Sequence, residues 1–167
     1  MSEPVKIGVV GVGYLGSIHA QIYTRLSEVT LVGVNDVNSD VGKRVAVDCG
    51  CDFYSNVDQL ADSVDAVSVV VPTSCHREVS LPFLHRGIPV LLEKPVAHTL
   101  DDARLIVNEA EQSGAILQIG HLERFNAGVV RLHEELDRPR FIEVHRLSEF
   151  VERATDVDVV TCLLYTS

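Results

Sequence analysis

Three glycines near the amino terminus have the spacing of a phosphate-binding turn. Gly11, Gly13 and Gly16 follow an apolar segment at 5–10 and open an amphipathic segment. In such a turn the first glycine permits a tight bend, the second lets a pyrophosphate approach the backbone, and the third allows close packing of helix on strand. The amino end of the helix adds free N–H groups and a partial positive charge. The spacing therefore predicts a dinucleotide site.

An acidic residue stands where the ribose of such a cofactor is bound. Asp36 lies about 20 residues beyond Gly16, at the end of a second apolar segment. A carboxylate there accepts hydrogen bonds from ribose hydroxyls and repels a 2′-phosphate, which favours NAD over NADP. Asn35 and Arg44 leave room for NADP. The alternative is an aspartate that only forms the turn after the strand.

The tripeptide Glu93-Lys94-Pro95 follows an apolar run at 87–92. A lysine is costly to bury, so one at the end of a buried strand is expected to face a ligand. In a parallel sheet the carboxyl ends of the strands border the ligand crevice. Pro95 fixes its own φ and favours an extended backbone at Lys94. The alternative for Lys94 is a solvated lysine in a loop.

Short apolar runs alternate with amphipathic stretches over the first 120 residues, which predicts the α/β class with a Rossmann-type doubly wound parallel sheet. The run at 66–71 is rich in β-branched residues, as is typical of a strand covered on both faces. Pro82 predicts a kink or break in its helix. The expected strands are 5–10, 31–34, 66–71, 88–93 and 116–119. The expected helices are 14–26, 39–48, 74–86 and 99–113.

The pattern changes near residue 121, which predicts a Rossmann domain over 1–121. Residues 122–160 read as the incomplete start of an α+β second domain, with a helix near 126–137 and a strand-like run at 140–150. A domain seldom stops inside its first structural unit, because the exposed apolar face has no partner. We therefore expect a truncation near 160, with 161–167 as a candidate foreign tail. An exposed domain edge would weaken cofactor binding or folding.

The composition excludes several partners. The net charge of −10 argues against nucleic acid, since phosphate binding needs clustered Lys and Arg. No apolar run approaches the roughly 20 residues that span a bilayer, and the amino terminus lacks the layout of a signal peptide. We expect a cytoplasmic protein that contacts no membrane.

The four cysteines are expected to be reduced thiols. Cys49-Gly50-Cys51 is too close for an ordinary disulfide and too short for a zinc knuckle. Cys75 and Cys162 have no paired motif near them. The seven histidines show neither HxxxH nor HExxH, so no metal site is expected.

Two further segments complete a family pattern. Pro72-Thr73-Ser74-Cys75-His76 follows one expected strand, and Gly120-His121-Leu122-Glu123-Arg124-Phe125-Asn126 follows another. Together with the glycine turn and Glu93-Lys94-Pro95, they resemble the glucose–fructose oxidoreductase, inositol dehydrogenase and rhizopine catabolism (Gfo/Idh/MocA) family over residues 5 to 160. The resemblance implies an NAD(P)-dependent dehydrogenase that is a homo-oligomer at full length. Hydride would pass between nicotinamide and a hydroxyl of a sugar, polyol or nucleotide sugar.

The resemblance also implies roles by position. Lys94 would be the active-site lysine, contacting the nicotinamide ribose and the substrate hydroxyl. Arg124 and Asn126 would border the substrate, the alternative for Arg124 being an interdomain salt bridge. His76 would line the path of the cofactor, the alternative being a surface residue. The implied cofactor contacts are Gly11, Gly13, Tyr14, Leu15, Gly16, Asp36, Pro72, Thr73, His76 and Glu93.

The residue types suit the implied chemistry. A lysine ammonium near the substrate oxygen stabilises developing alkoxide charge and can relay the proton. The alternative function is a non-catalytic NAD(P)-binding module that senses redox state, but such a module needs no proton relay, so Lys94 favours the enzyme. The run 121–126 resembles members that oxidise the 3-hydroxyl of UDP-N-acetylhexosamines. Family members add a His or Asp from a helix beyond residue 160, so the chain alone is expected to be inactive.

Overall fold

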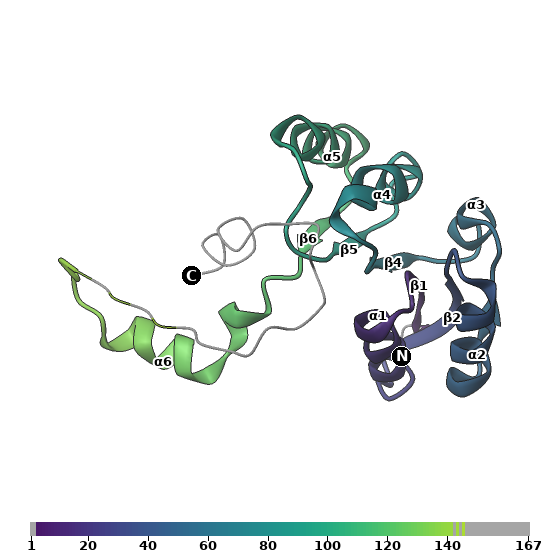
Figure 1. Ribbon diagram of the computed structural model, residues 1–167, viewed down its shortest axis with the longest axis horizontal. Helices are drawn as coiled ribbons and strands as arrows, with labels where there is room; N and C mark the ends of the chain where they lie inside the picture. The colour runs from purple at the N-terminus through teal and green to yellow at the C-terminus, as the bar shows by residue number, and fades with distance from the viewer. Residues whose placement is uncertain (1–2, 142, 144, 146–167) are drawn as a thin grey trace. The chain divides into compact units, whose positions relative to one another are not determined.

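The computed structural model describes residues 3–141, 143 and 145. It divides into two compact units, one ending at Gly120 and the other beginning at His121. Helices and strands alternate throughout the first unit (Figure 1). Each unit is described by itself below.

The first unit contains one parallel sheet whose strand order is β3-β2-β1-β4-β5-β6. The order reverses between β1 and β4, and ligands of doubly wound sheets bind at the carboxyl ends beside such a switch point. The predicted Rossmann-type parallel sheet is confirmed. The strands are β1 (Val5–Val10), β2 (Val29–Asn35), β3 (Asp52–Phe53), β4 (Ala66–Val69), β5 (Val90–Leu92) and β6 (Leu117–Ile119).

Helices cover the sheet through two separate hydrophobic clusters. One cluster joins β1 and β2 to α1 and α2, and the other joins β4 and β5 to α3, α4 and α5. In β4, Val67 and Val69 belong to the second cluster, so Ser68 between them faces the opposite side of the sheet. The helices of this unit are α1 (Tyr14–Tyr23), α2 (Ser39–Cys49), α3 (Val57–Ala61), α4 (His76–Leu84) and α5 (Leu100–Ser113), with a 3₁₀ turn at Thr73–Cys75.

The predicted elements are confirmed with shifted ends, whereas β3 and α3 were not predicted. They contain two and five residues, too few for a hydrophobic period to show. A kink or a break was predicted at Pro82, and the break is wrong, because α4 continues through Pro82 to Leu84. Phe83 and Leu84 are fully buried. Packing of this last turn therefore outweighs the loss of one backbone donor.

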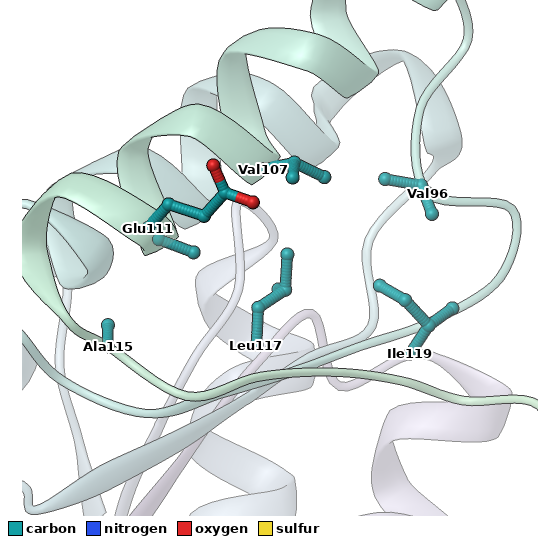
Figure 2. Close-up of a pocket in the computed structure, with 7 residues that line it drawn as sticks. Val96, Val107, Glu111, Ala115, Leu117 and Ile119 are labelled. Carbon is teal, nitrogen blue, oxygen red and sulfur yellow. The ribbon is translucent and has the colours of Figure 1, made fainter.

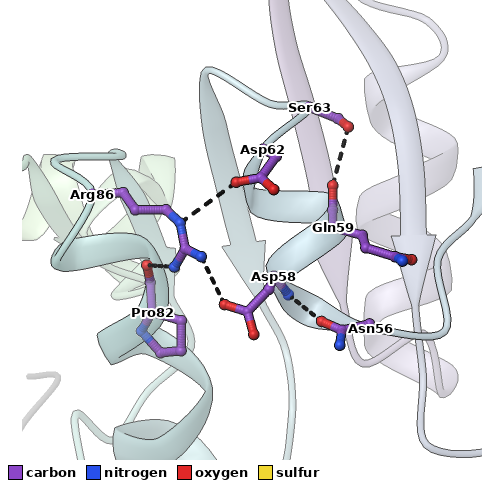
Figure 3. A network of polar contacts seen from close by, with 7 residues as sticks. All are labelled: Asn56, Asp58, Gln59, Asp62, Ser63, Pro82 and Arg86. Carbon is purple, nitrogen blue, oxygen red and sulfur yellow. Dashed lines mark hydrogen bonds and ion pairs between the residues drawn. The ribbon is translucent and has the colours of Figure 1, made fainter.

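An arginine fastens α3 to the end of α4 (Figure 3). Arg86 donates from Nη1 to the carbonyl of Pro82 at 2.7 Å and from Nη2 to Asp58 Oδ1 at 2.8 Å. Its Nε also lies 3.7 Å from Asp62 Oδ1. Because these groups are partly exposed, each ion pair contributes less than about 1 kcal/mol. Together they tie down the short helix that the sequence pattern did not reveal.

The second unit contains a 3₁₀ turn at Leu122–Phe125 and helix α6 (Ala127–Glu135), so the helix predicted near 126–137 is confirmed. The strand-like run at 140–150 falls mostly outside the described residues, as do Cys162 and the segment 161–167. Within the described ranges, no helix combines the length and apolar character needed to cross a membrane.

Candidate functional site

Two glycines of the turn after β1 are required by the fold itself. Gly11 has a φ of +80°, and a Cβ there would lie 2.5 Å from the carbonyl oxygen of Val70. A Cβ on Gly16 would lie 1.8 Å from the carbonyl oxygen of Gly11. Since both obstacles are backbone atoms, neither can move aside without reshaping the turn. These two glycines bring α1 close to the carboxyl ends of β1 and β4.

Gly13 differs from its two neighbours. Its φ is negative, at −64°, and a Cβ built on it meets no heavy atom within 4 Å. The ligand-free fold therefore gives no reason for a glycine at this position. The open space beside it lets a bulky group approach the backbone directly, as a pyrophosphate does in this kind of turn.

The amino end of α1 is open to an anion. Gly13 is the N-cap and offers no side-chain acceptor, whereas Asn38 caps α2 and Thr99 caps α5 with side-chain oxygens. The first turn of α1 contains no acidic residue. Its side chains Tyr14 and Leu15 are 72% and 39% exposed. The N–H groups of this turn and the helix dipole therefore suit the phosphates of a dinucleotide.

Asp36 is held against the glycine turn. Its Oδ2 accepts a hydrogen bond from Val12 N at 2.8 Å, and its Oδ1 accepts one from Asn38 N at 2.8 Å. The carboxylate thus forms the turn after β2, as the structural alternative required. It also lies beside the phosphate turn, and each oxygen keeps a further lone pair for a ribose hydroxyl. The two roles are compatible.

The segment after β4 places its polar residues along the same edge. Pro72 is exposed and Thr73 is buried. His76 is only 1% exposed, so the surface alternative for this residue is wrong. Its Nδ1 lies 3.2 Å from the carbonyl of Val96, and its Nε2 lies 3.1 Å from the carbonyl of Val71. His76 therefore links the segments that follow β4 and β5, and its contact with a cofactor stays a prediction.

Glu93 and Lys94 lie at the carboxyl end of β5. Lys94 is half-buried, and the peptide bond between Lys94 and Pro95 is cis. Glu93 is 7% exposed, and its Oε2 accepts a hydrogen bond from Lys94 N at 3.2 Å. The carboxylate of Glu93 is thus turned into the protein, where it supports the backbone of Lys94.

A partly buried histidine beside Glu93 was missed by sequence reasoning. His19 of α1 places Nε2 3.5 Å from Glu93 Oε1 and Nδ1 2.9 Å from Ser68 Oγ. The neighbouring Tyr23 has a raised pKa. Burial is the main cause, a hydrogen bond with Ser68 partly offsets it, and the charge of Glu93 adds to it. A signal was available in the sequence. His19 lies three residues after Gly16 in α1, so the two residues lie on the same helix face, the one that packs on the sheet.

Arg124 and Asn126 belong to the second unit. Arg124 is exposed. Asn126 is the N-cap of α6, where its Oδ1 accepts from Gly128 N at 2.9 Å and its Nδ2 donates to Glu123 Oε2 at 3.1 Å. The side chain of Asn126 therefore has a local structural task, and a role for either residue at a substrate stays a prediction.

An apolar hollow of about 370 Å³ lies between α5 and β6 (Figure 2). None of the predicted site residues lines it, and Glu111 supplies the charge of the lining, which disfavours an anionic cofactor. The lining residues are Val96, Val107, Ala110, Glu111, Ala115, Leu117 and Ile119.

The three cysteines in the described part of the chain are free thiols, Cys49, Cys51 and Cys75. Burial, with Cys49 and Asp52 nearby, raises the pKa of Cys51 to about 11. Among the described residues, no three His, Cys, Asp or Glu side chains gather as a metal site would require.

This chain is similar in sequence and fold to several known dehydrogenases. UDP-N-acetylglucosamine 3-dehydrogenase of Acidithiobacillus ferrooxidans is 36% identical over 161 residues, covering 96% of this chain and 51% of the relative. The solved structure of this enzyme matches with a TM-score of 0.88 at 34% identity, and the match covers 99% of this chain and 52% of the solved one. Inositol 2-dehydrogenase 1 of Saccharopolyspora erythraea is 33% identical over 139 residues, covering 80% and 41%. GenD2 from gentamicin A biosynthesis, solved in complex with NAD, matches with a TM-score of 0.76 at 30% identity. That match covers 80% of this chain and 39% of GenD2.

The chain thus spans about half the length of the curated relatives it matches. A family model described as the oxidoreductase family with NAD-binding Rossmann fold, GFO_IDH_MocA, matches residues 5–121. The match takes in the glycine turn, Asp36 and Glu93-Lys94-Pro95. The chain therefore belongs to the GFO_IDH_MocA oxidoreductase family and contains its NAD-binding Rossmann fold.

Proposed function

We propose that this chain binds NAD along the carboxyl ends of its strands and serves a dehydrogenase that acts on a hydroxyl of a sugar, polyol or nucleotide sugar. The observation that carries the proposal is Gly13, a glycine without a structural purpose in the ligand-free fold, placed at the uncapped end of α1. A ligand that approaches the backbone closely explains both features.

Different residues would bind different parts of the cofactor. The turn at 11–16 would hold the pyrophosphate, with Tyr14 and Leu15 beside it. Asp36 would accept hydrogen bonds from the adenosine ribose, and its charge disfavours the 2′-phosphate of NADP. Pro72, Thr73 and His76 would border the path toward the nicotinamide.

Lys94 would stand at the reacting end. When bound, the nicotinamide supplies the site that accepts or gives the hydride. The ammonium of Lys94 would stabilise negative charge on the substrate oxygen and relay its proton. Glu93 supports this role by fixing the backbone of Lys94.

The substrate class follows from the relatives, one of which is a UDP-N-acetylglucosamine 3-dehydrogenase and another an inositol 2-dehydrogenase. Sequence identity favours the nucleotide sugar, and Arg124 and Asn126 stay candidate contacts for it. A homo-oligomeric assembly and a cytoplasmic location are part of the proposal.

NADH and ADP-ribose titrations of this chain test the proposal, because ADP-ribose lacks the nicotinamide. We expect both ligands to bind. Lys94→Ala should raise the Kd for NADH by about threefold to tenfold and leave the Kd for ADP-ribose unchanged. The matched control is Lys6→Ala, an exposed lysine at the amino end of β1. If neither ligand binds, the proposal is wrong.

Turnover separates the enzyme from a redox-sensing module. A version of the chain extended to the length of the relatives should reduce NAD with at least one member of a panel of UDP-sugars and polyols, and Lys94→Ala should abolish this. Tight NAD binding without turnover on any panel member would favour the sensor.

A further inference from the structure

His19 connects the two ends of the proposed cofactor site. It belongs to α1, whose amino end would face the phosphates of the proposed cofactor, and its imidazole reaches the carboxylate of Glu93 beside Lys94. The side chains of His19 and Glu93 are 11% and 9% exposed, so this contact is shielded from water.

The carboxylate of Glu93 depends on His19. Glu93 Oε1 is buried and has no hydrogen-bond partner within the described part of the chain. His19 Nε2, at 3.5 Å, is within ion-pair range of that oxygen without the alignment of a hydrogen bond. On another side, a Cβ on Gly120 would lie 2.8 Å from the same oxygen. The imidazole is therefore a polar group that faces this oxygen at ion-pair range, and a buried carboxylate is costly to leave without a polar neighbour, so losing the imidazole would favour a turn of the Glu93 side chain away from its present position.

The imidazole is itself held in place. Its Nδ1 lies 2.9 Å from Ser68 Oγ, and Ser68 is fully buried in β4. The ring also meets Tyr23 edge-on, with centroids 6.4 Å apart. When the Ser68 hydroxyl donates to Nδ1, the proton of a neutral ring sits on Nε2 and faces Glu93. The chain of contacts then runs from Ser68 through His19 and Glu93 to the backbone N–H of Lys94.

We propose that His19 is a positioning residue that holds Glu93, and through it Lys94, in the geometry required at the nicotinamide end of the cofactor. The inference rests on the proposed function and deepens it. No proton is transferred through His19 in this role.

The test compares two substitutions that preserve different halves of the imidazole. In His19→Gln the amide nitrogen can take the place of Nε2 and donate toward Glu93, whereas in His19→Asn the amide oxygen can take the place of Nδ1 and accept from the Ser68 hydroxyl. Both remove the ring contact with Tyr23, so that loss is common to the two variants.

The first measurement is the amide NMR spectrum of the ligand-free chain, in which the Lys94 N–H reports its bond to Glu93. We expect the Lys94 signal to move in His19→Asn and to stay near the wild-type position in His19→Gln, while the Gly13 signal stays in place in both. Equal displacement of Lys94 in both variants, or displacement in neither, would overturn the inference.

The second measurement is the Kd for NADH and ADP-ribose. His19→Asn should raise the Kd for NADH by about threefold to tenfold and leave that for ADP-ribose unchanged, while His19→Gln should stay within about twofold of wild type for both. If both variants lost the same affinity for NADH and for ADP-ribose, His19 would have a purely structural role, and the inference would be wrong. A wild-type chain that binds neither ligand contradicts the proposed function instead, and the Lys94 signal then still decides whether His19 holds the loop.

Discussion

The two ends of the proposed cofactor site are built differently. At the phosphate end the determinants are mostly backbone: two glycines that admit no side chain, Gly11 and Gly16, a helix without a side-chain cap, and the carboxylate of Asp36 bonded to two N–H groups. At the Lys94 end the determinants are side chains shielded from solvent, His19 of α1, Ser68 of β4 and Glu93 directly after β5. The phosphate end is therefore set by local chain geometry, whereas the other end depends on long-range packing.

The largest effect is expected from Gly16→Ala. The new Cβ would collide with the carbonyl of Gly11, so the turn must open at a cost of about 3 kcal/mol or more. Thermal unfolding should show a large drop in Tm, and NADH and ADP-ribose binding should be lost together. A variant with wild-type stability would show that the phosphate end is less constrained than the geometry indicates.

Gly13→Ala should separate binding from folding. Its Cβ meets nothing in the ligand-free protein, so Tm should stay the same or rise slightly, since alanine restricts the unfolded chain. Both ligands should bind at least about tenfold more weakly, because the methyl group occupies the space of the pyrophosphate. Unchanged ligand affinity would refute the assignment of this glycine.

Asp36→Ala should change cofactor preference. Loss of the carboxylate removes the ribose contact and the repulsion of a 2′-phosphate, so the ratio of NADH to NADPH affinity should fall by about tenfold. Stability should fall by about 1–3 kcal/mol, because Val12 N and Asn38 N lose their acceptors. Asp36→Asn keeps one acceptor oxygen and is the matched control. An unchanged affinity ratio would reduce Asp36 to a turn-forming residue.

The smallest effect concerns alkaline titration at the Lys94 end. Burial and the charge of Glu93 raise the pKa of Tyr23 above its ordinary value of 10.0. Glu93→Gln removes the charge and should lower this pKa, measured by phenolate absorbance against Tyr23→Phe in each background. Because the folded-state pKa is raised, Tyr23 stabilises the fold below pH 10, and this contribution is lost as the pH rises through the folded-state pKa. An unmoved titration would show that Glu93 does not act on Tyr23.

The same contrast explains what the sequence could predict. Gly11, Gly13, Gly16 and Asp36 lie within one strand–helix–strand segment, so their spacing alone indicated the sheet edge and the phosphate turn. The strand pattern also placed Lys94 at the end of β5. His19 and Glu93 are 74 positions apart (93 minus 19), and no local period relates them. The burial of His76 and the continuity of α4 through Pro82 likewise depend on tertiary packing.

Gly120 bears on how this chain could be recombined. It is the last residue of the first unit, and any side chain there would press on the carboxylate of Glu93. In a chimera that joins a different second unit after β6, any other residue at this junction would therefore displace the carboxylate of Glu93, whatever sequence follows. Even an alanine scar left by cloning would disturb Glu93, and through it the backbone of Lys94.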